Sequence, residues 1–218
     1  MAKVIAKTSI KGKKVLNNKI NEVIIGNQIW TAKNLDRTYF INGDKITIAK
    51  SLKEWKSLNS SKTPACCYYE FNEKKFSTGG LLYNFYALSD ERSLAPLGFR
   101  LPSDKDWTDL IEYCGKKKLA GEVLKARSGW ESFSASHGNG KDSYNFNALP
   151  VGYLNNRAGE DLEFMNFEFM TVFWTNSFKK GTTNEVYYWQ FNSGKSVERD
   201  TTIIDKDIMG LSLRCIKV

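Results

Sequence analysis

Residues 95–115 read APLGFRLPSDKDWTDLIEYCG and contain the clearest helix signal in the chain. Ser103 offers a hydroxyl to the first free amides of a helix, and the acidic residues after it favour the positive end of the helix dipole. Gly115 supplies a stop. Between them, apolar residues recur at the spacing of one helix face, namely Trp107, Leu110, Ile111 and Cys114. We therefore predict an amphipathic helix that packs one face against a core.

The chain before this helix predicts a hairpin and an irregular segment. In residues 23–30, apolar runs flank Gly26-Asn27, a pair that tolerates positive φ, so two short strands around a turn are expected. Residues 42–63 mix Asn-Gly, Ser and Lys with isolated apolar side chains. This composition predicts an irregular stretch with at most one helical turn.

The chain after this helix predicts one more helix and then strands. The second, shorter helix is expected at residues 120–126, with Val123 and Leu124 facing inward. Beyond Trp130, short apolar or aromatic runs are separated by Gly, Asn and Ser, which is typical of strands and long loops. The expected strands lie within residues 144–153, 171–178, 185–191 and 211–218. The chain is thus predicted to fold as an α+β protein.

The positive charge is concentrated at the start of the chain. Of the formal net charge of +8, six units come from lysines that precede the first acid, Glu22, so the remaining residues carry only +2. Such a run is typical of a solvated tail. We predict a flexible basic arm at residues 1–20 and one domain at residues 21–218, and we do not expect a nucleic-acid-binding protein.

Membrane and export signals are not evident in the sequence. No run approaches the roughly 20 apolar residues of a membrane span, and residues 1–20 lack the continuous apolar stretch of a secretory signal. The four cysteines, Cys66, Cys67, Cys114 and Cys215, form no CxxC pair. Buried free thiols are therefore the expected state.

The residues that could carry catalysis or bind a metal are sparse. His137 is the only histidine, so no His-based triad or multi-His zinc site can form. Two acidic clusters, Asp104 with Asp106 and Asp109, and Glu160 with Asp161 and Glu163, are interpreted as solvated surface. We expect no cofactor and no metal.

Seven blocks of sequence together resemble the Fibrobacter succinogenes major paralogous domain. Their common order along the chain makes the resemblance more specific than any one motif. The blocks are IGNQIWTAKNL (25–35), LYNFYA (82–87), APLGFRLPSDKDW (95–107), AG (120–121), FNALPVGY (146–153), FWTNS (173–177) and GLSLRC (210–215).

This resemblance implies a C-type-lectin-like fold of the kind shared with formylglycine-generating enzymes. Such a fold has two helices, a small twisted antiparallel sheet and long loops, with the chain ends near each other. Members of the family are mostly surface or lipoprotein modules. Some are variable proteins of diversity-generating retroelements, in which the segment that resembles residues 174–214 carries the variable positions.

The chain departs from the family pattern in three respects. The usual export signal is missing, Phe99-Arg100-Leu101 stands where the family more often has Trp-His-Val, and the basic arm is not part of the domain. A particle-borne protein such as a phage fibre tip needs no signal peptide, and its arm could attach it to another component. The alternative is a truncated cell-surface protein; if neither holds, the protein is expected to be cytoplasmic.

An aromatic series near the C-terminus predicts the ligand surface. By comparison with the family, the side chains of Tyr188 and Phe191 are expected to face the core. Those of Tyr187, Trp189 and Gln190 are then expected to be exposed to solvent. Exposed rings beside short polar side chains are typical of recognition surfaces, although such rings can also simply cover a sheet. The remaining polar part of the expected surface comprises Asn176, Asn192, Ser193, Lys195, Glu198, Arg199, Asp200 and Asp205.

These observations favour a non-enzymatic domain that binds a protein or a glycan. Calcium-dependent sugar binding is not favoured, because none of the four prolines lies in Glu-Pro-Asn or Gln-Pro-Asp and Trp174 is followed by Thr175-Asn176. One alternative is a structural component of a particle or envelope. Another is an oxidase like the formylglycine-generating enzymes, which use two cysteines near the end of this fold, whereas here only Cys215 lies there.

Overall fold

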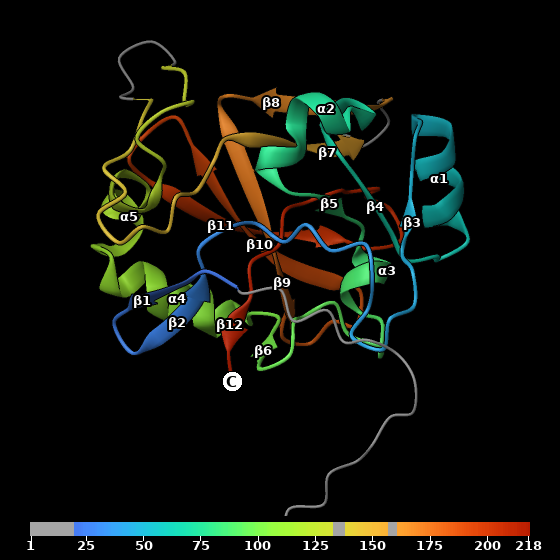
Figure 1. Ribbon diagram of the computed structural model, residues 1–218, viewed down its shortest axis with the longest axis horizontal. Coiled ribbons are helices and arrows are strands. Elements are labelled where there is room, and N and C mark those ends of the chain that lie inside the picture. Colours follow the sequence, from blue (N-terminus) through green and yellow to red (C-terminus); the bar gives the residue numbers. More distant parts are fainter. Residues whose placement is uncertain (1–19, 133–137, 157–160) are drawn as a thin grey trace, which may run out of the picture.

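A five-stranded sheet crosses the centre of the molecule in the computed structural model, which describes residues 20–132, 138–156 and 161–218 (Figure 1). Its strand order is β11-β10-β9-β7-β8, and all neighbours are antiparallel except β7 and β9, which are parallel. The strands are β7 (Val151–Asn156), β8 (Leu162–Phe167), β9 (Met170–Phe178), β10 (Glu185–Asn192) and β11 (Val197–Ile203).

The middle of β9 is buried on both faces, and β10 contributes buried side chains to the core beside α4. On one face, Phe173 and Phe191 pack with Trp107 of α4 (Asp104–Tyr113), and α5 (Lys116–Leu124) completes this core. On the other face, Val172 and Trp174 belong to a second core. Because successive strand residues point to opposite faces, nearly every residue in the middle of β9 is buried.

A smaller sheet joins the beginning of the domain to its end. Its order is β1-β2-β12-β6, where β1 is Glu22–Ile25, β2 is Gln28–Thr31, β6 is Phe99–Arg100 and β12 is Ile216–Lys217. The predicted hairpin is confirmed, with Gly26 at φ +58° in the turn. Lys217 Nζ lies 2.8 Å from a carboxylate oxygen of Glu22, so the two ends of the domain are neighbours.

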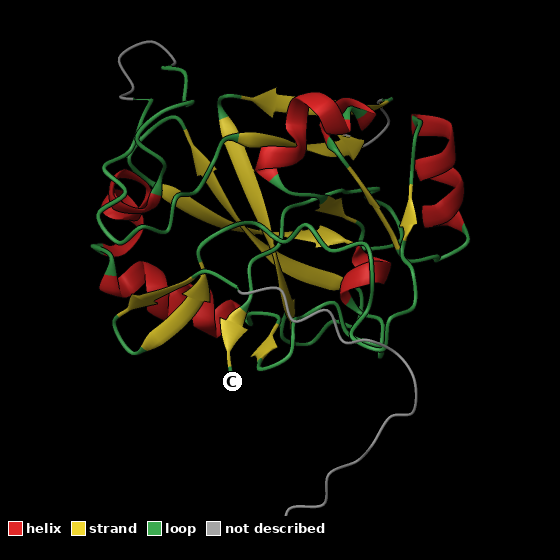
Figure 2. Ribbon diagram, in the orientation of Figure 1, coloured by secondary structure: helices red, strands yellow, loops and turns green. Residues whose placement is uncertain are grey.

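The remaining strands form a third sheet. A three-stranded sheet contains β3 (Thr47–Ile48), β4 (Ala65–Cys67) and β5 (Leu82–Tyr83). The helices α1 (Leu52–Ser60) and α3 (Phe85–Leu88) contact β4. The helix α2 (Glu73–Phe76) contacts the 3-10 turn Ser77–Gly79 that follows it, and the other 3-10 turn is Tyr69–Phe71 (helices are red in Figure 2).

The predicted central helix is confirmed in detail. The Ser103 side chain accepts from the backbone N–H of Asp106 at 3.1 Å, and the Asp106 carboxylate accepts from the N–H of Ser103 at 2.7 Å, which completes a capping box. The four residues predicted to face the core are all buried.

Other element predictions were wrong or incomplete. Residues 42–63 contain the nine-residue helix α1, because Ser51 caps its first turn and Trp55 fills a core. The second helix begins at Lys116 rather than residue 120, immediately after the left-handed turn at Gly115. Residues 144–150 form a loop rather than a strand. In the predicted strand region 211–218, only Ile216–Lys217 is a strand. The short strands β3 to β6 were not predicted, nor were β8, whose apolar residues are interrupted by Glu163 and Asn166, and β11, which is mostly polar.

The C-terminal segment 210–216 is buried between the sheets and carries one charged side chain. Arg214 donates to Asn34 Oδ1 at 2.7 Å and to the carbonyls of Thr31 at 2.8 Å and Asn147 at 3.1 Å. Its guanidinium carbon lies 4.5 Å from the centre of the Phe146 ring. Burial lowers the pKa of Arg214 to about 9. The four cysteines are buried free thiols, as predicted.

We predict that Arg214→Lys lowers the free energy of unfolding by roughly 2–4 kcal/mol, because an ammonium cannot reach all three acceptors and leaves buried carbonyls unpaired. Urea unfolding of the variant measures this loss. Arg127→Lys, at an exposed position, is the control and should leave the midpoint unchanged. Equal midpoints for the two variants would contradict the structural role of Arg214.

Candidate functional site

The first residue of α4 organises a group of exposed side chains. Asp104 accepts a hydrogen bond from Trp189 Nε1 at 3.1 Å through one oxygen and from Arg199 Nη1 at 2.9 Å through the other. The guanidinium carbon of Arg199 lies 4.7 Å from the centre of the Tyr187 ring. Arg199 is exposed and Tyr187 is half-buried. A tyrosine, an arginine and an aspartate are thus held together at the surface.

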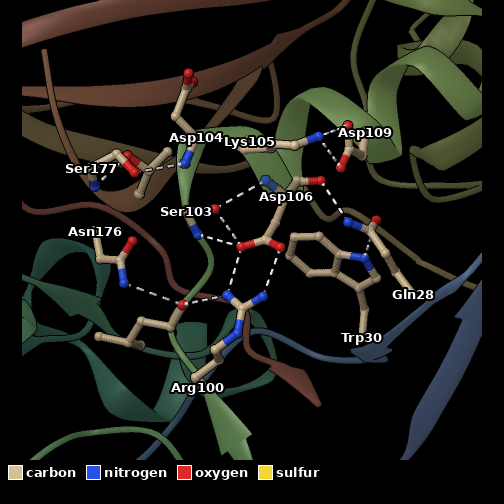
Figure 3. A network of polar contacts seen from close by, with 12 residues as sticks. Gln28, Trp30, Arg100, Ser103, Asp104, Lys105, Asp106, Asp109, Asn176 and Ser177 are labelled. Carbon is tan, nitrogen blue, oxygen red and sulfur yellow. Dashed lines mark hydrogen bonds and ion pairs between the residues drawn. The ribbon is translucent and has the colours of Figure 1, made fainter. Parts of the chain in front are cut away.

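The bulged end of β9 adds two residues to this group. Three residues of β9, between Trp174 and Phe178, lie opposite the single residue Tyr187 of β10, and the Thr175 hydroxyl donates to the Tyr187 carbonyl at 2.8 Å. Ser177 Oγ accepts from the backbone N–H of Asp104 at 3.0 Å, beside Asn176 (Figure 3). We call Asp104, Asn176, Ser177, Tyr187 and Arg199 the Asp104 surface.

The prediction that Trp189 is exposed was wrong. Trp189 is 1% exposed, because it points toward α4 and packs in the core beside that helix. Lys117 Nζ lies 5.5 Å from the centre of its ring. Phe191 is buried as expected, whereas Tyr188 is half-buried on the opposite face. Trp189 therefore supports the Asp104 surface from beneath.

An ion pair between the buried Asp106 and the exposed Arg100 fixes the start of α4. Arg100 donates to both oxygens of Asp106, at 2.6 and 2.8 Å, and Gln28 Nε2 donates to the Asp106 carbonyl at 3.0 Å (Figure 3). Burial opposes ionisation of Asp106, but hydrogen bonds from Arg100 and Ser103 outweigh it and hold its pKa below the ordinary value. The interpretation of this cluster as solvated was therefore wrong for Asp106. Asp109 is exposed as expected and pairs with Lys105 at 2.8 Å.

Three predicted ligand residues of β10 and β11 lie on the face of the sheet opposite to Tyr187 and Arg199. Gln190 pairs with Glu198 across the strands, and its amide donates to that carboxylate at 2.8 Å. Asp200 accepts from the Tyr188 hydroxyl at 3.4 Å. Because neighbouring residues alternate between faces, these side chains cannot share one surface with Tyr187 and Arg199.

The turn between β10 and β11 contains three more predicted residues and is held from inside. Lys125 is 1% exposed and donates to the carbonyls of Asn192, Ser193 and Gly194 at 3.0, 2.9 and 2.7 Å, and to that of Gly138 at 2.6 Å. Its ammonium lies 4.6 Å from the centre of the Trp130 ring, and burial lowers its pKa to about 8.

This anchoring changes the role of the turn residues. Ser193 was expected at the surface but is buried, because its carbonyl accepts a hydrogen bond from the buried Lys125 ammonium. We call Lys125 and the four carbonyls around its ammonium the Lys125 cage. Asn192 is half-buried and caps the turn by accepting from the N–H of Gly194 at 2.8 Å. Lys195 lies 3.4 Å from Glu122 of α5. Sequence reasoning missed Lys125, because nothing in the neighbouring sequence distinguishes it from the exposed lysines 116–118 or predicts that it is buried.

The last predicted residue, Asp205, lies beyond the far end of β11. It pairs with Lys62 at 3.1 Å and accepts from the Tyr86 hydroxyl at 3.3 Å. The structure thus brings Tyr187 and Arg199 to Asp104, places Asn176 next to Ser177 with its amide donating to the Leu101 carbonyl at 3.4 Å, and places the other predicted residues beneath this surface or elsewhere.

The described residues contain no group of three or more His, Cys, Asp or Glu side chains placed to hold a metal ion. His137 and Glu160 lie outside the described residues, while Asp161 and Glu163 are exposed as expected. In the same described part of the chain, no helix has the length and apolarity needed to span a bilayer.

The family model for the Fibrobacter succinogenes major domain matches residues 23–217. The chain belongs to this family. The family resemblance read from the seven sequence blocks is confirmed. The matched Fibrobacter succinogenes major domain runs from β1 to β12 and includes all three sheets and the whole Asp104 surface. No curated protein and no solved structure matches the chain.

We predict that Asp106→Asn lowers the free energy of unfolding at neutral pH by about 1–2 kcal/mol, because the charge-assisted hydrogen bonds that Asp106 accepts from Arg100 and Ser103 are weakened or lost. The pKa of Asp106 is lower in the folded than in the unfolded protein, so its carboxylate stabilises the fold above the unfolded pKa of about 4. That stability is lost as the pH falls through the folded pKa. Urea unfolding at neutral and acidic pH should show the two proteins converging at low pH. Asp109→Asn is the control, and a difference independent of pH would contradict the mechanism.

We predict that Lys125→Met, which keeps an unbranched side chain one atom shorter and removes the ammonium, lowers the free energy of unfolding by about 3 kcal/mol, because it leaves buried carbonyls unpaired. Amide hydrogen exchange should accelerate in residues 192–196 before it does so elsewhere. Lys118→Met, at an exposed position of α5, is the matched control. Unchanged exchange in that turn would contradict its anchoring by Lys125.

Proposed function

We propose that this domain is a non-enzymatic binding module with a C-type-lectin-like fold, which recognises a protein or a glycan through the Asp104 surface. The observation that carries the proposal is the stack of Tyr187 and Arg199 over Asp104. Tyrosine and arginine are enriched among residues that dominate binding energy. Here both are held in place before any ligand arrives, which lowers the entropy cost of association.

Several features support the finer assignment of the fold. The capped helix α4 and the adjacent α5 pack against a sheet made from the late part of the chain, and long connections separate the elements. Glu22 and Lys217 meet at the ends of the domain. These features support what the family resemblance implies for a C-type-lectin-like domain, whereas α1 and the parallel pairing of β7 with β9 are additional to the two helices and the antiparallel sheet that it implies.

We further propose that the chain displays variable side chains, as the variable proteins of diversity-generating retroelements do, on a virion or cell surface. Within residues 174–214, Asn176, Glu198 and Arg199 are exposed, so their replacement changes the surface without opening the core. Trp189, Phe191 and Ser193 are buried and would be kept. In this proposal the basic arm at residues 1–20 attaches the domain to another component.

The state of the thiols supports binding over oxidase chemistry. Burial raises the pKa of Cys66, Cys114 and Cys215 to about 12. Because the thiolate is the reactive form, such cysteines are poor nucleophiles at neutral pH. Cys215 packs in the core of the domain, which is the structural role expected for it.

The test compares two double variants on a panel of cell-surface proteins and glycans. Tyr187→Ala with Arg199→Ala should lower the affinity for any ligand found by at least about tenfold, since both side chains are hot-spot types. Tyr113→Ala with Arg127→Ala removes the same residue types from exposed positions outside the Asp104 surface and should leave binding unchanged. Circular dichroism and urea unfolding establish that both variants remain folded.

Two outcomes would count against the proposal. Binding that is equal in both double variants would move the ligand site away from the Asp104 surface. Failure of every ligand on the panel, together with stable self-association in light scattering, would favour a structural component of a particle or envelope.

A further inference from the structure

A pocket of about 170 Å³ lies at the side of the domain, away from the Asp104 surface. It opens between the 3-10 turn Ser77–Gly79, the bend at Gly129, residues 149–151 and the turn between β8 and β9. No residue of the Asp104 surface lines it. The pocket therefore offers a second place where the domain can bind a ligand, independently of the Asp104 surface.

Three aromatic rings form one wall of the pocket. Tyr69, Phe76 and Phe167 are in mutual contact, with ring centres 4.9 to 5.2 Å apart and two of the three pairs arranged edge to face. Leu149, Pro150 and other aliphatic residues complete the lining. A further ring can add to this cluster by the same edge-to-face or offset contacts, which contribute beyond apolar burial alone.

The mouth of the pocket carries one positive and one negative side chain. Lys75 and Glu168 both line it and are exposed. Lys75 Nζ lies 4.8 Å from the centre of the Phe76 ring and 3.9 Å from Glu70. The backbone of Glu168 is held at φ +68°, where its N–H donates to the Pro150 carbonyl at 2.9 Å and its carbonyl accepts from Glu131 N–H at 2.8 Å. This unusual conformation for a non-glycine residue fixes Glu168 at the mouth.

The volume and lining select the ligand. A dry cavity of about 150 Å³ lined by apolar side chains is sufficient to bind benzene in another protein. A sugar would bring several hydroxyls against the apolar wall and leave them unpaired. A cationic ligand would meet Lys75, which already lies over the Phe76 ring. A neutral ring with one hydroxyl can bury its ring and leave the hydroxyl at the mouth.

We propose that this pocket binds a single phenol ring, with the ring against Tyr69, Phe76 and Phe167 and the hydroxyl between Lys75 and Glu168. A phenol hydroxyl both donates and accepts, so it can donate to the carboxylate and accept from the ammonium. The ring can come from a free small phenol or from a tyrosine side chain of a partner protein.

The test titrates the full chain with probes that differ by one feature, monitored by ligand-detected NMR and calorimetry. We expect p-cresol to bind with a Kd on the order of 1 mM or tighter. Toluene, which lacks the hydroxyl, should bind more weakly, and 4-methylcyclohexanol and methyl glucoside should bind weakest. N-acetyltyrosine amide separates the sources: binding as tight as that of p-cresol favours a partner's tyrosine, and clearly weaker binding favours a free phenol.

Two variants locate the site. Thr78→Trp places an indole at the exposed rim and should weaken p-cresol binding about tenfold or more by filling the mouth. Glu168→Gln should weaken p-cresol roughly tenfold, as a charge-assisted hydrogen bond becomes a neutral one, and leave toluene unchanged. Glu163→Gln, on β8 outside the pocket, is the matched control.

The proposal is overturned by any of three results. They are no detectable p-cresol binding at about ten times the expected Kd, equal binding of p-cresol and 4-methylcyclohexanol, and p-cresol affinity that neither Thr78→Trp nor Glu168→Gln changes. If Glu168→Gln loses p-cresol binding but still binds the ligand recognised through Tyr187 and Arg199, the pocket and the Asp104 surface are separate binding sites.

Discussion

The buried C-terminal segment 210–216 is the constraint that joins the three sheets. Leu211 exchanges backbone hydrogen bonds with Tyr83 of β5 at 2.9 and 3.1 Å, Ser212 accepts from Trp174 of β9 at 3.1 Å, and the Cys215 carbonyl accepts from Thr31 of β2 at 2.9 Å. Buried backbone groups must find partners. Because this segment finds them on three separate sheets, its path fixes how the sheets lie relative to one another, as the deep red chain in Figure 1 shows.

Two buried cations extend this constraint to the connections between elements. Arg214 and Lys125 donate chiefly to backbone carbonyls and lie against aromatic rings, and no hydrogen bond joins either of them to a carboxylate among the described residues. Desolvation of a cation is costly, and several carbonyl dipoles together with a ring face can offset it. The hydrogen bonds from Arg214 and Lys125 also provide donors for backbone carbonyls in irregular segments, which no neighbouring strand pairs with. Long connections in this domain are therefore held from the interior.

The features that the sequence predicted correctly depend on interactions between residues that are close together in the chain. The cap of α4 and the turn at Gly26 involve residues within four positions of each other, so their signals are complete in the local sequence. The burial of Trp189 depends on α4, whose Asp104 lies 85 residues away in the chain, and the Lys125 cage depends on carbonyls up to 69 residues away. Tyr187 and Arg199 could be predicted as a surface because of their residue types, but the division of their neighbours between two faces required the strand pairing.

The Asp104 surface combines replaceable side chains with a base that does not depend on them. If Arg199 is replaced, Asp104 still accepts from Trp189 and still lies at the positive end of the α4 dipole, so the charge stays compensated. If Asn176 is replaced, the bond between its backbone N–H and the Pro102 carbonyl remains. Replacing Arg214 or Lys125 instead leaves several buried carbonyls without donors. The exposed polar side chains of the Asp104 surface thus lie where backbone and core already satisfy one another, which is the physical requirement that the proposed variable surface would have to meet.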